Sequence, residues 1–124
     1  MSLALMMPAS AAAAGGFSYT ILKNHCTNYP AVVFKVSVTA AGSTNANKLT
    51  INSKGQTGSP GHWTTYQTWP RVTSKFVNDG TSHSLAVKRT YLGDAFARNR
   101  IVFKLRAWHG RTLLWSAKVI SKTC

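Results

Sequence analysis

The sequence almost lacks acidic residues. It contains two aspartates, Asp79 and Asp94, and no glutamate, against 15 lysines and arginines. The formal net charge is therefore +13 at pH 7. Such a surplus favours anionic partners, namely an acidic protein, an acidic glycan, anionic lipid or nucleic acid. A simpler explanation is that the charge only keeps the protein soluble, but solubility alone does not require so few acids.

The scarcity of acidic residues also leaves few carboxyl groups that could act in catalysis. Glycoside cleavage needs two positioned carboxyl groups, and each aspartate adjoins a glycine in an expected turn or loop. No nucleophile-elbow motif is present. One alternative function is a small cytotoxic or antimicrobial effector such as a basic ribonuclease, in which two imidazoles would act as general acid and base. The candidate histidines are His25, His62, His83 and His109. No two of these lie at metal-ligand spacing, so we expect no catalytic site, no metal and no cofactor.

The chain also lacks a long apolar run, since none approaches the roughly 18 residues that a transmembrane helix requires. Its first residues, MSLALMMPASAAAAGG, are uncharged and end in alanines that fit signal-peptide cleavage after Ala14. This stretch differs from most signal peptides because no basic residue precedes Lys23. We expect a leader over residues 1–14, a single mature domain over 15–124, and secretion to the extracellular space.

Only two cysteines occur, Cys26 and the final residue, Cys124. In an exported protein an even pair is most simply a disulfide. Their separation excludes a CxxC redox pair, and a metal site would need further ligands. The bond would close nearly the whole mature chain, for which a loop-entropy model gives about 4.7 kcal/mol of stabilisation.

Helical periodicity is missing from the mature chain. Val, Ile, Thr and aromatic residues alternate with polar ones, and Gly, Asn, Pro and Ser clusters interrupt them about every ten residues. We expect an all-β fold, a small antiparallel β-sandwich of about seven or eight strands with immunoglobulin-like or Greek-key connectivity. Strands are predicted at residues 17–21, 32–39, 48–53, 72–77, 84–91, 100–109 and 112–120.

Four features between the strands carry local predictions. The Gly-rich stretch 54–61 is expected to be a mobile loop that cannot pack. Pro70 favours an edge strand or a strand break, and Asn78-Asp79-Gly80 favours a hairpin turn. Residues 92–99 form a connection with room for one helical turn.

The last two strands can be aligned by their apolar faces. A three-residue loop, or an equivalent bulge, pairs Phe103 with Val119, Leu105 with Ala117 and Ala107 with Trp115. The opposite face then carries Arg106 and Trp108, with Trp108 opposite Leu114. It also places Lys104 directly opposite Lys118. Two like charges at directly opposed positions of neighbouring strands lower the stability of the fold unless an anion lies between them.

These observations predict a binding surface that is basic and aromatic. Its candidate residues are Lys104, Arg106, Trp108, Lys118, Trp63, Tyr66, Trp69 and Arg71. Both Trp63 and Trp69 would fit the core equally well. We expect a secreted, non-catalytic binding module or adaptor. It would engage either an acidic protein, as one subunit of a larger secreted assembly such as an antibacterial toxin, or an anionic envelope glycan. Nucleic acid is a further alternative.

Overall fold

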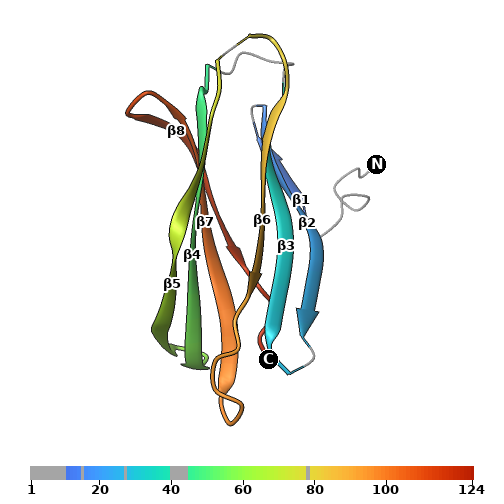
Figure 1. The fold of residues 1–124 in the computed structure, drawn as a ribbon, viewed down its shortest axis with the longest axis vertical. Helices are drawn as coiled ribbons and strands as arrows, with labels where there is room; N and C mark the ends of the chain where they lie inside the picture. Colours follow the sequence, from blue (N-terminus) through green and yellow to red (C-terminus); the bar gives the residue numbers. More distant parts are fainter. Residues whose placement is uncertain (1–10, 15, 27, 40–44, 78) are drawn as a thin grey trace.

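The chain forms an all-β sandwich with one disulfide (Figure 1). We analysed a computed structural model of residues 1–124, which describes residues 11–14, 16–26, 28–39, 45–77 and 79–124. That part of the chain contains no helix, and hence none that could cross a membrane. The strands are β1 (Ala11–Ala14), β2 (Phe17–Cys26), β3 (Pro30–Val38), β4 (Lys48–Ser59), β5 (His62–Lys75), β6 (His83–Thr90), β7 (Arg98–His109) and β8 (Thr112–Ile120).

The strands form two four-stranded antiparallel sheets that pack face to face. Sheet A has the order β1-β2-β3-β6, and sheet B has the order β5-β4-β7-β8. The chain changes sheet after β3, after β5 and after β6. Strands β2 to β8 correspond in order to strands A, B, C, C′, E, F and G of immunoglobulin-like sandwiches, with no counterpart of strand D. The predicted sandwich is therefore confirmed.

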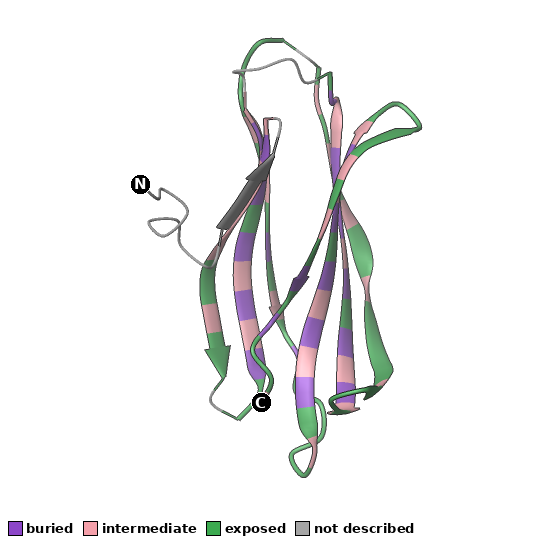
Figure 2. Ribbon diagram, turned by 180° about the vertical axis from the view of Figure 1, so that it is seen from behind, coloured by how far each residue is buried: buried purple, intermediate pink, exposed green. Residues whose placement is uncertain are grey.

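Alternating apolar side chains from both sheets build the core. Buried and less buried residues follow one another along β3, β4 and β7 (Figure 2). The rings of Phe34 in sheet A and Phe103 in sheet B meet edge to face at 4.5 Å. Around them lie further fully buried side chains, including Leu49, Ile51 and Leu105. Period-two alternation thus places one face of each sheet against the other.

The register predicted for the last hairpin is confirmed. Phe103 pairs with Val119, Leu105 with Ala117 and Lys104 with Lys118. A two-residue turn, with Gly110 at a positive φ of 58°, closes the hairpin, and the register shifts next to Trp108. The bulge replaces the three-residue loop, so Trp108 faces Leu113 rather than the predicted Leu114.

The prediction of a mobile loop over residues 54–61 was wrong. Most of this stretch is the second half of β4, which pairs with both β5 and β7 in the interior of sheet B. Glycine fits there because a Cβ atom on Gly55 would lie 2.4 Å from the ring of Tyr91. The glycine therefore admits an aromatic side chain from the opposite layer, where the sequence pattern only indicates flexibility.

Three other local predictions met different outcomes. Pro70 lies at the edge of the sandwich as expected, but β5 continues through it without a break. Asp79 lies in a turn, yet the turn connects the two sheets and does not close a hairpin, since β5 pairs with β4 and β6 with β3. Residues 92–97 contain turns and no helix.

The N-terminal leader remains a prediction. Residues 1–10 lie outside the described residues, whereas Ala11–Ala14 form β1 and pair with the first half of β2. The boundaries of the mature domain, residues 15–124, likewise stay a prediction.

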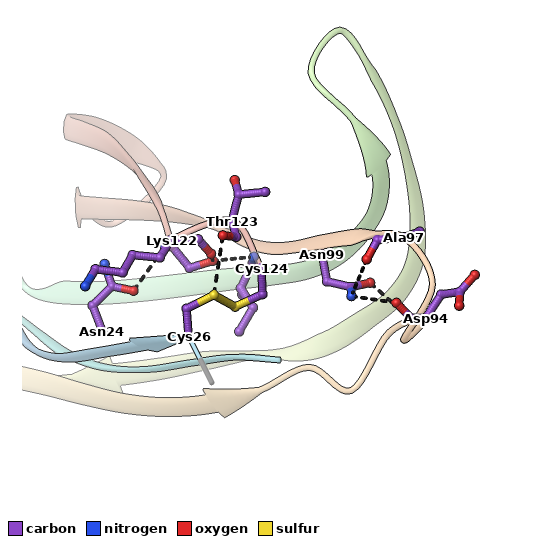
Figure 3. Close-up of a disulfide and its surroundings, with 10 residues drawn as sticks. Asn24, Cys26, Asp94, Ala97, Asn99, Lys122, Thr123 and Cys124 are labelled. Carbon is purple, nitrogen blue, oxygen red and sulfur yellow. Dashed lines mark hydrogen bonds between the residues drawn. A yellow bond between two sulfur atoms is a disulfide. The ribbon is translucent and has the colours of Figure 1, made fainter. Parts of the chain in front are cut away.

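The disulfide joins the two layers at one end of the sandwich. Cys26 closes β2 in sheet A, and Cys124 ends the tail that follows β8 in sheet B; their Cα atoms are 5.5 Å apart. The tail is also held by hydrogen bonds (Figure 3). The Lys122 N–H donates to Asn24 Oδ1 at 3.0 Å, and the Cys124 N–H donates to the Asn99 carbonyl at 2.9 Å.

Replacing both cysteines by serine should lower the free energy of unfolding by about 4.7 kcal/mol, because the bond closes a loop of nearly 100 residues in the unfolded chain. The two cysteines are 98 positions apart. Urea unfolding of the wild type and of C26S/C124S measures the difference. Reductant should destabilise only the wild type. A loss below about 1 kcal/mol would contradict a stabilisation that comes from loop closure in the unfolded chain.

Candidate functional site

The outward side of sheet B is densely basic. Residues of β4, β5, β7 and β8 that alternate with the core residues point away from sheet A. We call this surface the basic face, and its cations are Lys48, Lys54, Lys75, Arg98, Arg100, Lys104, Arg106 and Lys118. Neither aspartate lies on it, because Asp79 and Asp94 belong to connections between the sheets.

The charge is unevenly distributed between the two layers. The outward side of sheet A carries only Lys23, Lys35 and Lys88 among the basic residues of its strands. Among the described residues the one ion pair is between His83 and Asp79, at 3.1 Å and away from the basic face. The cations of the basic face therefore have no carboxylate partner within the described chain.

A hollow of about 380 Å³ lies at the centre of the basic face. Lys104 and Lys118 lie directly opposite one another there, on β7 and β8. Five of the lining residues are basic and two carry amides; the lining is Asn52, Lys54, Gln56, Arg100, Val102, Lys104, Arg106 and Lys118. A cross-strand pair of like charges costs about 0.2–1 kcal/mol, so the hollow concentrates an unfavourable interaction.

The two amides of the hollow differ in their hydrogen bonding. Gln56 Oε1 accepts a bond from Arg100 Nε at 2.9 Å, and its Nε2 donates to Thr65 at 3.1 Å. Asn52 Oδ1 is buried and has no partner among the described residues. Burial also lowers the pKa of Arg100 from its usual value. The hollow thus combines unpaired cations with one acceptor that lacks a donor.

Tryptophans border the basic face at both ends. Trp63 lies beside Gly58 at one end, with the guanidinium of Arg100 4.3 Å from its ring centre. Trp108 lies at the other end, where Lys48 Nζ approaches its ring centre at 5.2 Å. Its Nε1 donates to Thr50 at 2.9 Å. Cation–π contacts of this kind position the basic side chains.

The structure brings together five of the eight predicted binding residues: Lys104, Arg106, Trp108, Lys118 and Trp63. Trp69 instead lies on the core side of β5, where its ring packs edge to face against Tyr91 at 6.4 Å. Tyr66 is exposed and lines a different hollow with Gly93 and Asp94. Arg71 is exposed at a register shift of β5.

Sequence reasoning missed several cations of the basic face. Alternation along β7 would have added Arg98 and Arg100, because both share parity with Lys104. Lys54 and Gln56 are hidden for another reason, since the sequence predicts a loop over residues 54–61. Only their pairing with β5 and β7 shows that they point outward.

The four histidines occupy separate places. His83 Nε2 lies 3.1 Å from Asp79 Oδ1, and its ring stacks on Phe76. Hydrogen bonds from Thr81, and then from His83, hold the pKa of Asp79 well below its usual range. His109 contacts the Asn45 carbonyl at the same end of the sandwich, whereas His25 and His62 lie on strands at the opposite end. Among the described residues no three His, Cys, Asp or Glu side chains could hold a metal.

Replacing Lys118 by glutamine should stabilise the free protein by about 0.5 kcal/mol at low ionic strength, because it removes one partner of a like-charge pair. The gain should shrink in about 1 M salt, where charges are screened within a few ångströms. Thermal unfolding at two salt concentrations measures it. Lys122→Gln is the matched control, since Lys122 lies in the tail after β8. Equal gains from both variants would contradict a specific cost at Lys118.

Comparison with known proteins does not place the chain in a family. No family model matches the chain, and neither a curated protein nor a solved structure is similar enough to match it. What the basic face binds must therefore be argued from its own residues.

Proposed function

We propose that this chain is a secreted, non-catalytic binding module that holds an acidic glycan against the basic face of sheet B. One observation carries the proposal. In a single hollow, Lys104 and Lys118 face each other without a carboxylate, next to the partnerless acceptor Asn52 Oδ1. The disulfide, and the lack of a membrane-spanning helix in the described residues, are compatible with secretion.

An anion would relieve the repulsion at the centre of the face. Lys104 and Lys118 can both donate charge-assisted hydrogen bonds, each worth about 1.5–3 kcal/mol, to a single bound carboxylate or phosphate. Arg106 lines the same hollow and adds a further donor. The arrangement costs stability in the free protein and gains it on binding, as expected of a functional surface.

The acceptor on Asn52 narrows the chemistry of the ligand. A carboxylate offers no proton, so it would satisfy the lysines and leave Asn52 Oδ1 unpaired. A sugar that carries an acidic group presents hydroxyl donors beside its anionic oxygens, and so supplies both requirements within one unit. Because a buried polar atom without a partner costs free energy, hydroxyl recognition at Asn52 favours a glycan.

The dimensions of the basic face fit an extended polymer. β4 runs ten residues from Lys48, which pairs with Trp108, to Gly58, which pairs with Arg98. This length is about 33 Å at the usual rise of a strand. Neither Trp63 nor Trp108 offers an open platform for stacked bases, since Arg100 lies over the ring of Trp63 and Lys48 over the ring of Trp108. A chain of several acidic sugars could lie along the strands and contact successive cations.

The other functions predicted from the sequence gain no comparable observation. An acidic protein partner and membership of a larger toxin assembly remain predictions. The ribonuclease alternative needs two imidazoles around one phosphate. The four histidines lie on four different strands, two at each end of the sandwich.

Isothermal titration with oligogalacturonate, a carboxylated glycan, tests the proposal against uncharged dextran. The wild type should bind the acidic glycan alone, and K104Q/K118Q should bind it at least about tenfold more weakly, because two charge-assisted bonds are lost. The matched control is K23Q/K88Q, which removes the same charge from the outward side of sheet A. It should lose much less affinity.

Other outcomes would replace the proposal. Equal losses in both double variants would show attraction by net charge without a site. Tighter binding of poly-L-glutamate than of the glycan would favour an acidic protein partner. Cleavage of RNA that disappears in a His→Ala variant would establish the enzymatic alternative. Asn52→Leu sharpens the test, since it should weaken glycan binding while leaving unchanged the affinity for sulfate, an anion with no hydroxyl to donate.

A further inference from the structure

The connection between β6 and β7 exposes two large apolar side chains. Phe96 is 99% exposed and Leu92 is 68% exposed. This β6–β7 loop, residues 91–97, extends beyond the other loops at its end of the sandwich (Figure 1). Single exposed apolar residues are common on soluble proteins. A fully exposed phenylalanine on a fixed, protruding loop is a more specific feature, because it holds an apolar ring ready for contact.

Asn99 holds the loop in place from beneath. It is 1% exposed at the start of β7. Its Oδ1 accepts bonds from the Asp94 N–H at 3.0 Å and from the Thr57 hydroxyl at 2.7 Å. Its Nδ2 donates to the carbonyls of Asp94 at 2.9 Å and Ala97 at 3.3 Å (Figure 3). One buried side chain therefore fixes both ends of the segment that carries Phe96.

Two further contacts make the loop rigid. Asp94 Oδ1 accepts a bond from the Phe96 N–H at 2.9 Å, which turns the carboxylate back toward the loop. Gly93 has a φ of +56°, and a Cβ atom there would lie 2.0 Å from Asn99 Oδ1. The loop thus has a close-packed base and an apolar tip. Little conformational entropy would be lost when the tip is immobilised in a partner.

Cations accompany the apolar tip. Arg98 directly follows the loop and is exposed, and Lys122 is exposed in the tail that pairs with the start of β7. Tyr66, which is 70% exposed, lines a hollow together with Gly93 and Asp94 on the flank of the loop. Asp94 is the one acidic side chain within the loop itself, residues 91–97. An apolar tip with aromatic and basic neighbours is the composition that suits the interface of an anionic bilayer.

We propose that Phe96 and Leu92 insert into the interfacial region of a membrane with anionic headgroups, while Arg98 and Lys122 contact those headgroups. The net charge of +13 attracts the whole molecule to such a surface. Two apolar side chains bury far less area than the roughly 1,200 Å² of a stable protein interface. They suit weak, reversible attachment to a bilayer better than a permanent protein complex. This contact lies at one end of the basic face, with which it shares Arg98, and it does not rest on the glycan proposal.

Co-sedimentation with large unilamellar vesicles tests the proposal. The wild type should bind vesicles of equimolar phosphatidylglycerol and phosphatidylcholine more tightly than vesicles of phosphatidylcholine alone. Phe96→Ser should weaken binding to the anionic vesicles about tenfold, and Leu92→Ser somewhat less, because each removes an inserted apolar side chain. The matched control is Leu22→Ser, an exposed leucine of sheet A, which should bind as the wild type does.

Three results would overturn the proposal: no binding of the wild type to anionic vesicles, wild-type affinity in Phe96→Ser, or an equal loss in Leu22→Ser. Thermal unfolding of each variant confirms that the fold is retained. Titration of Phe96→Ser with oligogalacturonate separates the two proposals. It should leave glycan affinity unchanged, whereas K104Q/K118Q should lose glycan affinity and keep the contribution of Phe96 to vesicle binding.

Discussion

The pairing of β4 with β7 in the middle of sheet B is the constraint on which the rest of the molecule depends. This register places Ile51 beside Leu105 on the core side and Asn52 beside Lys104 on the outward side. Because side chains alternate with a period of two, a shift by one residue would expose the apolar set and bury the cations. The core and the basic face are therefore consequences of one alignment, and neither can change without the other.

That alignment separates the source of stability from the candidate function. Phe34, Phe103 and their neighbours supply the buried apolar area between the sheets, and the disulfide restricts the unfolded chain. The outward side of sheet B contributes repulsion between Lys104 and Lys118. A small domain can accept this cost because its stabilising interactions lie on the opposite faces of the same strands. An anion that binds there would contact a surface whose side chains contribute little to the stability of the fold.

Asn99 plays a comparable organising role at one end of the sandwich. Its backbone pairs with Cys124, so the disulfide-linked tail aligns with β7. Its buried side chain contacts Thr57 of β4 and the backbone of the β6–β7 loop. A buried amide of this kind must satisfy several bonds at once, which restricts the loop to one conformation. Phe96 is exposed on the segment that these bonds hold.

The sequence by itself determined the sandwich, the disulfide and the register of the last hairpin. Each depends on local alternation or on a count of cysteines, and the apolar pairing of Phe103 with Val119 leaves only one consistent alignment. Lys104 and Lys118 could be placed opposite each other for the same reason. These features are encoded in neighbouring residues, so inspection of the chain was enough to predict them.

Only the tertiary structure decided where the glycines and the aromatic residues belong. Gly55 lies in a central strand because Tyr91, far away in the sequence, occupies the space of a side chain. Trp69 packs on the core side and Trp63 borders the basic face because bulges in β5 change which side of the sheet each residue meets. Contacts between distant strands decide such positions, and period-two alternation within one strand carries no information about them.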